Sequence, residues 1–225
     1  NPLLDEKLKE ELASLDEEKL NDAFYTDLEF GTGGLRGVLG VGTNRMNIYT
    51  VQKATYGFYE YLREKYADLN ERGMVISYDC RNYSYEFASA AASVFASNGV
   101  KVYLFSSLRP TPELSFAVRK LKCAGGIMIT ASHNPPEYNG YKVYDEDGCQ
   151  LIPELADIVI NKIENIKDIF GIEVKDFNEL KDAGLITLID KEVDDAYLEQ
   201  VNNQLSILSS SLNINKNFNL PKKLF

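Results

Sequence analysis

Three short apolar runs, separated by stretches of helix length, are the feature that most constrains the fold of this chain. The runs cover residues 74–78, 100–105 and 124–129, and each has the length of a buried strand. Between them, Ser84 can cap an alanine-rich helix and Thr111, followed by proline and glutamate, can begin another. Strands that alternate with helices predict crossover units. The expected fold class is therefore α/β, with a mixed, largely parallel sheet sandwiched by helices.

Other segments extend this pattern at both ends of the chain. Apolar residues spaced three and four apart predict amphipathic helices, and a short apolar run predicts one more strand. The predicted elements are a helix from Leu3 to Leu20, a helix capped by Thr50 that runs to about Leu69, a helix from Pro153 to about Ile169, a strand over residues 185–189, and a last helix that starts around Glu192.

The composition excludes several classes of partner. A formal net charge of -10 argues against a general nucleic-acid surface or an anionic membrane surface, although a few local cations could still bind a small anion. The three cysteines are widely spaced and odd in number, which fits a reducing compartment and fits neither a disulfide framework nor a CxxC metal site. No apolar run approaches the ~18 to 20 residues of a membrane span, and the acidic amino terminus is no signal peptide. We expect a cytoplasmic protein; no oligomeric state is predicted.

A polar loop follows the third apolar run and contains the most informative residues. Thr130-Ala131-Ser132-His133-Asn134-Pro135-Pro136 holds the only histidine of the chain, directly beside a serine. Open α/β sheets place their chemistry at the carboxyl ends of the strands, where this loop is expected to lie.

Four interpretations of Ser132 and His133 compete. The pair can simply stabilise a turn. A serine hydrolase is disfavoured because adjacent side chains of an extended backbone point to opposite sides, and no second histidine can serve as base. Metal ligation by a single histidine lacks a partner at ligand spacing. A phosphorylated serine would carry about two negative charges and would need nearby cations, for which Arg36 and Lys142 are candidates.

Arg36 lies in a glycine-rich stretch, residues 30–42, that can approach a ligand closely. The stretch lacks the Lys-Ser/Thr end of a P-loop, and a dinucleotide-binding pattern would need glycine where Arg36 stands. It is best described as a glycine loop that presents one arginine. A glycine-rich hairpin with a solvated arginine is the simpler alternative.

Two acidic segments are also candidates. Asp145-Glu146-Asp147-Gly148 lacks the remaining ligands of a calcium loop, and its place between two short apolar segments favours a hairpin turn between residues 141–144 and 149–152. Asp79-Cys80-Arg81 ends a strand; it can face a site, or its Asp and Arg can pair and order the loop.

Three of these segments together resemble the amino-terminal domain of the α-D-phosphohexomutases. They are Phe30-Gly31-Thr32-Gly33-Gly34-Leu35-Arg36-Gly37, the Asp79-Cys80-Arg81 loop, and the serine loop followed by Asn139-Gly140-Tyr141-Lys142. The resemblance covers roughly residues 20–205. It is greatest to the phosphoglucomutase branch that includes phosphopentomutase-like members.

The resemblance implies an enzyme that interconverts sugar 1-phosphate and 6-phosphate, with glucose as the expected sugar, through a phosphoserine and a bisphosphate intermediate. Ser132 would carry the phosphoryl group, Arg36 and Lys142 would support its transfer and proton movement, and His133 would orient the nucleophile. Mg2+ would bind an oxygen of the phosphoserine. The alternatives are a phosphopentomutase, a phosphomannomutase, or a noncatalytic α/β module that binds sugar phosphates.

The resemblance also implies a domain organisation. Residues 1–190 would form the phosphoserine-bearing domain I, and residues 191–225 a linking helix and the start of a truncated second domain. Family members have four domains, so we expect a fragment that is inactive alone. An Asp-Gly-Asp-rich metal loop is expected downstream of Phe225.

Overall fold

The structure is a computed structural model that describes residues 4–31 and 33–211. The chain divides into two units, Asn1–Ile189 and Asp190–Phe225. The described part of the second unit is one helix, α9 (Lys191–Ser211). Its assignment to the start of a second domain stays a prediction.

Within the described residues of the first unit, the strands form one sheet of order β1-β2-β6-β5-β3-β4-β7. Neighbouring pairs from β5 through β3 and β4 to β7 are parallel. Every residue of β3 and β5 is buried, as expected for strands covered on both faces. The parallel strands are β3 (Met74–Tyr78), β4 (Val102–Phe105), β5 (Gly125–Ile129) and β7 (Ile186–Ile189). The predicted α/β class with a mixed sheet is confirmed.

The other half of the sheet is antiparallel. β6 (Tyr138–Tyr144) returns beside β5, β2 (Gly34–Val38) pairs with β6, and β1 (Phe30–Gly31) pairs with β2. The glycine-rich stretch is thus the β1–β2 hairpin at the sheet edge. Thr32 lies outside the described residues.

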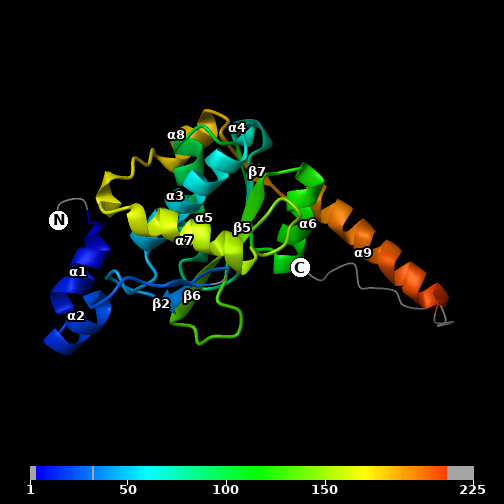
Figure 1. The fold of residues 1–225 in the computed structure, drawn as a ribbon. Coiled ribbons are helices and arrows are strands. Elements are labelled where there is room, and N and C mark those ends of the chain that lie inside the picture. Colours follow the sequence, from blue (N-terminus) through cyan, green and yellow to red (C-terminus); the bar gives the residue numbers. More distant parts are fainter. Residues whose placement is uncertain (1–3, 32, 212–225) are drawn as a thin grey trace. The chain divides into compact units, whose positions relative to one another are not determined.

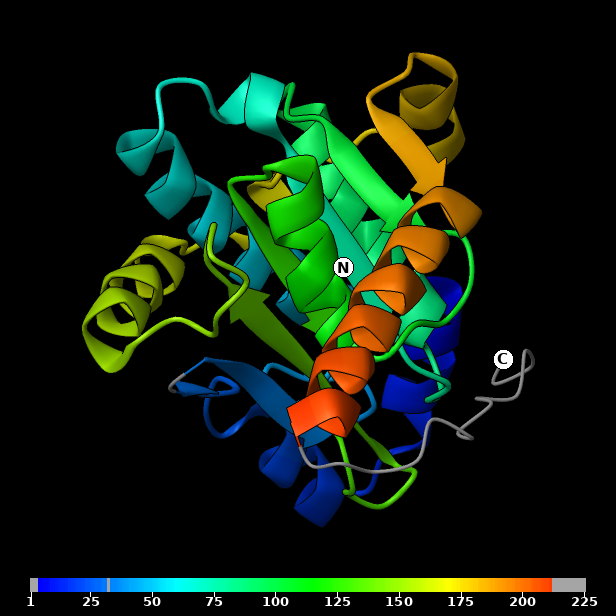
Figure 2. The same ribbon diagram turned by 90° about the vertical axis from the view of Figure 1, so that its right-hand side faces the viewer.

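Helices cover both faces of the sheet (Figures 1 and 2). The chain passes from β3 to β4 in one direction and from β4 back past β3 to β5 in the other, so right-handed crossovers place α5 (Ser84–Ser97) and α6 (Thr111–Leu121) on opposite faces. α3 (Ile48–Lys65) packs beside α5, and α7 (Pro153–Asn165) packs on α3. The shorter helices are α4 (Leu69–Arg72), η1 (Ile169–Gly171) and α8 (Phe177–Asp182).

The core lies between the sheet and these helices. Its largest fully buried side chains include Phe58, Phe95, Leu104 and Ile127, and each such apolar side chain stabilises the fold by about 1.5–3 kcal/mol. Gly57 lets α7 approach α3, because a Cβ there would overlap the side chain of Ile163.

The prediction of a single amino-terminal helix was wrong. Two helices form instead, α1 (Glu6–Ser14) and α2 (Glu17–Phe24), because the Asp16 side chain accepts a hydrogen bond from the Lys19 N–H and caps a new start. α1 has no buried residue, and a hydrogen bond from Val41 N to Glu11 Oε1 (3.1 Å) ties it to the domain.

Several predicted boundaries also differ. Asn47, not Thr50, caps α3, and Thr50 completes a reciprocal capping box with it. The predicted helix to Leu69 ends at Lys65, and the one to Ile169 ends at Asn165. The second arm of the predicted hairpin is reduced to one bridge, between Tyr144 and Gln150. The helices predicted to be capped by Ser84 and Thr111 instead include both residues.

Candidate active site

The serine loop leaves the carboxyl end of β5, where the sequence predicted it. Ser132 has a φ of 57°, in the left-handed region that non-glycine residues rarely adopt. Its N–H donates to Thr130 Oγ1 (2.9 Å), and Asn134 N donates to the Ala131 carbonyl (3.1 Å). The loop is therefore a tight turn rather than an extended segment.

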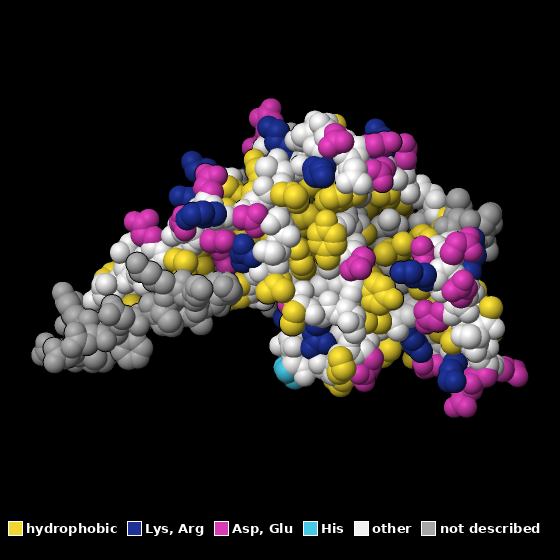
Figure 3. All heavy atoms as spheres, turned by 180° about the vertical axis from the view of Figure 1, so that it is seen from behind, with side chains coloured by type: hydrophobic (Ala, Val, Ile, Leu, Met, Phe, Trp, Pro, Cys, Tyr) yellow, Lys and Arg dark blue, Asp and Glu magenta, His cyan; other side chains and the backbone are white. Residues whose placement is uncertain are grey.

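The turn contradicts the expectation that the side chains of Ser132 and His133 diverge. Because the backbone is not extended, Ser132 and His133 do not point to opposite sides, and Ser132 Oγ lies 3.4 Å from His133 Nδ1. That distance is at the long limit for a hydrogen bond, so it orients the hydroxyl only weakly. Figure 3 shows the histidine at the molecular surface.

The Arg81 side chain binds the backbone of the serine loop at several carbonyls. Its Nη1 donates to the carbonyls of Pro135 and Tyr138 (both 2.9 Å), and its Nη2 to those of Ser132 (2.7 Å) and Asn134 (2.6 Å). Both alternatives considered for the Asp79-Cys80-Arg81 loop thus find support: Arg81 faces the serine loop, and its Nε lies 3.7 Å from Asp79 Oδ2.

Asp79 holds the backbone from which Arg81 projects. Its Oδ1 accepts hydrogen bonds from Arg81 N and from Ser84 Oγ, both 3.0 Å long. These bonds join the end of β3 to the first turn of α5, so the arginine projects from a backbone that is itself anchored.

Asn139 was not predicted and links the same segments. Its side chain is fully buried; Nδ2 donates to the Asn82 carbonyl (2.9 Å) and to Ser84 Oγ (3.0 Å), and Oδ1 accepts from Gly140 N (2.7 Å). A buried asparagine with three hydrogen bonds rigidifies its surroundings. Asn139 belongs to the Asn139-Gly140-Tyr141-Lys142 segment that carries the resemblance, but no role was predicted for its side chain.

The two predicted cations lie on neighbouring strands. Arg36 on β2 pairs in register with Gly140 on β6, and Gly140 in turn accepts a hydrogen bond from Thr130 N. Lys142 lies two residues further along β6. Burial, and then the charge of Arg36, lower the pKa of Lys142, whereas Asp79 opposes that shift. The structure therefore brings Arg36 and Lys142 together on two neighbouring strands, of which β6 adjoins β5, the strand that leads into the serine loop.

Gly34 permits this close pairing. Its φ is 149°, and a Cβ would overlap the carbonyl oxygen of Tyr141 on β6. Only glycine can bring the two backbones so near at this position.

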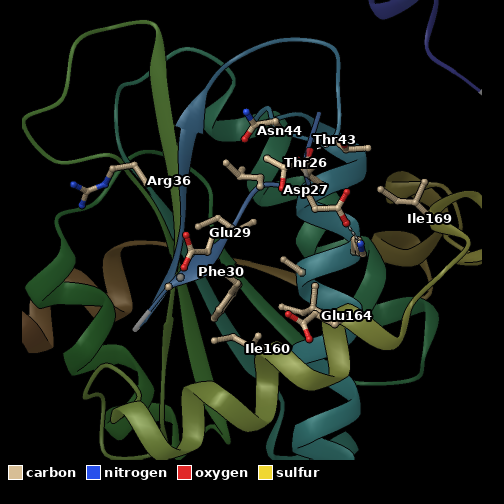
Figure 4. A pocket seen from close by; sticks show the side chains of 18 of the residues that line it. Thr26, Asp27, Glu29, Phe30, Arg36, Thr43, Asn44, Ile160, Glu164 and Ile169 are labelled. Atoms are coloured by element: carbon tan, nitrogen blue, oxygen red, sulfur yellow. Dashed lines mark hydrogen bonds and ion pairs between the residues drawn. The ribbon is translucent and has the colours of Figure 1, made fainter. Parts of the chain in front are cut away.

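A separate hollow lies on the other side of the hairpin (Figure 4). It has a volume of about 990 Å³ and is lined by residues of the segment before β1, such as Asp27 and Glu29, and of α7, such as Ile160 and Glu164, together with residues of β1 and α3. Arg36 borders this hollow, but its side chain points away from the other labelled residues. The hollow is consequently distinct from the serine loop.

In the part of the chain that the structure describes, no group of three or more His, Cys, Asp or Glu could hold a metal ion. The Asp145 carboxylate instead accepts hydrogen bonds from Asp147 N (3.0 Å) and Cys149 N (2.9 Å), which tightens the turn favoured over a metal loop. Residues 4–31 and 33–211 also contain no helix long and apolar enough to cross a membrane.

The fold and this loop define an α/β domain that presents Ser132 at the carboxyl edge of its parallel strands. Residues 27–169 match the family model described as phosphoglucomutase/phosphomannomutase, alpha/beta/alpha domain I. The chain belongs to that family, as the resemblance predicted.

Curated relatives agree with this assignment, and a solved structure shares the fold. The chain is 47% identical over 158 residues to a mouse phosphopentomutase, a match that covers 68% of this chain and 26% of the relative. It is 41% identical over 185 residues to a phosphoglucomutase of Staphylococcus saprophyticus, covering 82% of this chain and 33% of the relative. The crystal structure of a phosphoglucomutase/phosphomannomutase family protein from Burkholderia thailandensis shares the fold, with a TM-score of 0.57 and 22% identity over 76% of this chain and 34% of that one. The chain thus spans a quarter to a third of the length of these proteins.

Proposed function

We propose that this chain is the phosphoserine-bearing domain of a sugar-phosphate mutase, with glucose 1-phosphate and 6-phosphate as its substrates. The observation that carries the proposal is the left-handed Ser132 in the loop between β5 and β6, with the cations Lys142 on β6 and Arg36 on the adjoining β2. Family membership and relatives named phosphoglucomutase and phosphopentomutase support the same chemistry.

The proposed reaction is a reversible phosphoryl transfer. A substrate hydroxyl attacks the phosphorus of phosphorylated Ser132, and its P–O bond forms as the bond to Ser132 Oγ breaks. Neutral Lys142 would accept the hydroxyl proton, and the freed Ser132 oxygen would take up a proton to become a hydroxyl. The second half transfers a phosphoryl group from the bisphosphate back to Ser132. Arg36 and Lys142 would stabilise the charge of the transferring group, and positioned cations contribute most of the catalysis in such reactions.

Lys142 is suited to proton movement as well. Since burial and Arg36 lower its pKa, it gives up a proton more readily than an ordinary lysine. His133 would orient Ser132 Oγ through the 3.4 Å contact.

Mg2+ is part of the proposal, and it would neutralise developing charge on the phosphoryl group. The described residues do not by themselves fit the ion, because they hold no ligand cluster. Ser132 would supply one oxygen through its phosphate. We propose that the remaining ligands belong to the part of the relatives that this chain does not match.

The same reasoning extends to the whole protein. Residues 1–190 would act as the serine-bearing domain, with residues 191–225 leading into a second one, and the enzyme would be cytoplasmic. A glucose, mannose or pentose specificity is decided by assaying the three phosphates in parallel with the full-length enzyme; a preference for mannose or pentose phosphate would refute the assignment to glucose.

The mechanism is tested by intact mass and site mapping of the full-length enzyme, together with Ser132→Ala. We expect one phosphate, on Ser132, and loss of mutase activity in the variant. Ser14→Ala is a matched control, because its exposed hydroxyl only donates to the Glu11 carbonyl on α1. Phosphate on another residue, or full activity of Ser132→Ala, would refute the proposal. Tight binding of a sugar phosphate without any turnover would favour the noncatalytic module.

A further inference from the structure

The conformation of Ser132 needs an explanation, because a serine does not adopt a φ of 57° without support. The bond from Ser132 N to Thr130 Oγ1 fixes only one side of its backbone. The other side, the Ser132 carbonyl, accepts a hydrogen bond of 2.7 Å from Arg81 Nη2.

Arg81 binds more than this one carbonyl. Its two terminal nitrogens donate to four backbone oxygens, and the side chain is only 11% exposed. The four acceptors extend from the serine to the first residue of β6: Ser132, Asn134, Pro135 and Tyr138. The guanidinium thus joins both ends of the loop.

This arrangement requires arginine. A planar guanidinium presents five N–H groups in fixed directions, whereas a lysine ammonium has three donors on a single atom and cannot reach four divergent oxygens. The Asp79 carboxylate, which binds Arg81 N and lies 3.7 Å from its Nε, restricts the side chain to this direction.

We infer that Arg81 is a positioning residue that sets the left-handed conformation of Ser132 and so aims its Oγ. The inference rests on the proposed function of Ser132 and adds a residue that acts through the loop backbone without touching the substrate. Arg81 holds the backbone of Ser132. By contrast, the proposed roles of His133, Arg36 and Lys142 concern the Ser132 hydroxyl and the oxygens of the phosphoryl group.

Arg81→Lys in the full-length enzyme tests the inference, since it keeps the charge and removes the planar fork. We expect kcat to fall on the order of 10²-fold with little change in KM, because a displaced nucleophile loses rate without losing substrate binding. Arg119→Lys is the matched control: Arg119 also donates to a backbone carbonyl, that of Asp147, and to Ser115 Oγ, but at a remote turn. It should leave kcat unchanged.

Hydrogen exchange of residues 130–138, followed by mass spectrometry, gives a readout that does not depend on activity. Exchange there should be slow in the unmodified enzyme, faster in Arg81→Lys and unchanged in Arg119→Lys. Guanidinium added to Arg81→Ala should restore part of its kcat, which an unfolded variant would not show.

Three results would overturn the inference: a folded Arg81→Lys enzyme with normal kcat, a loss of kcat without faster exchange, or exchange in the unmodified enzyme as rapid as in exposed loops. The last needs no variant to fold. Failure of the proposed function is separate, because it appears as full activity of Ser132→Ala whatever the exchange of the loop.

Discussion

Replacing Gly140 by alanine should damage the serine site through the backbone alone. Gly140 has no positive φ, so a Cβ adds no backbone strain, but that Cβ would lie 2.5 Å from the Thr130 carbonyl oxygen and 3.0 Å from that of Leu35. Real Cβ contacts are essentially never under 3.0 Å, so the new Cβ and the Thr130 carbonyl oxygen must move apart by about 3.0 − 2.5 = 0.5 Å. The hydrogen bond from Thr130 N to Gly140 O (3.0 Å) crosses the same gap and lengthens with it.

Gly140→Ala should lower both the stability of the protein and its kcat. Overpacking of this kind typically destabilises a protein by about 1–3 kcal/mol. Because Thr130 Oγ1 also holds Ser132 N, a shift of half an ångström moves the nucleophile, and we expect kcat to fall by about tenfold or more.

Gly31→Ala is the matched control, because it lies in the same sheet, has no positive φ, and a Cβ there meets nothing closer than 4.0 Å. It should be neutral or should stabilise the protein by up to about 1 kcal/mol through the unfolded chain. Urea unfolding followed by far-UV circular dichroism gives the free energies, and mutase assays of the full-length enzyme give kcat. Equal free energies of unfolding for the two variants would refute the steric reasoning.

Three further predictions concern the same region. The folded protein binds the Lys142 proton less tightly than the unfolded chain does, so the unmodified protein gains stability as the pH rises through the lowered pKa toward 10.5. Lys142→Met should remove this gain. Arg36→Gln should raise the pKa of Lys142, as amine titration by NMR would show. An unchanged Lys142 titration in Arg36→Gln would contradict this. Asn139→Ala should cost about 2–3 kcal/mol in urea unfolding, because buried partners lose three hydrogen bonds; a loss below about 0.5 kcal/mol would contradict it. Ser132→Gly should be more stable than Ser132→Ala by about 1 kcal/mol, since glycine relieves the left-handed strain; the reverse order would exclude that strain.

Much of the sheet could be predicted, because strand length and apolar character depend on local sequence. β3, β4, β5 and β7 lie where short apolar runs predicted them. Helix starts were harder. Asn47 and Thr50 are both good capping residues three positions apart, and the structure uses both in one capping box, so the sequence alone did not decide which residue begins α3.

The serine loop was located by its residues, but its conformation was not predicted. Arg81 acts on four backbone carbonyls, and a carbonyl has the same chemistry in every residue, so no spacing of side chains reveals such a contact. The left-handed φ of Ser132 follows from those bonds rather than from the preference of serine, which favours other conformations. The loop was expected to be extended because these backbone hydrogen bonds leave no mark in the sequence.

The observed proximity of Ser132 and His133 does not restore the hydrolase interpretation. A hydrolase needs a base that removes the serine proton and a third group that orients the base. The contact here is 3.4 Å long, and the histidine lies exposed at the surface. A phosphorylated serine has no hydroxyl proton to remove. Its reaction instead requires cations that face the phosphoryl group and a group that accepts the substrate proton. Arg36 on β2 and Lys142 on β6, which adjoins β5, fit that demand, as does the lowered pKa of Lys142. The chemistry of the neighbouring strands, rather than the nearest side chain, therefore favours a phosphoryl carrier over a hydrolytic nucleophile.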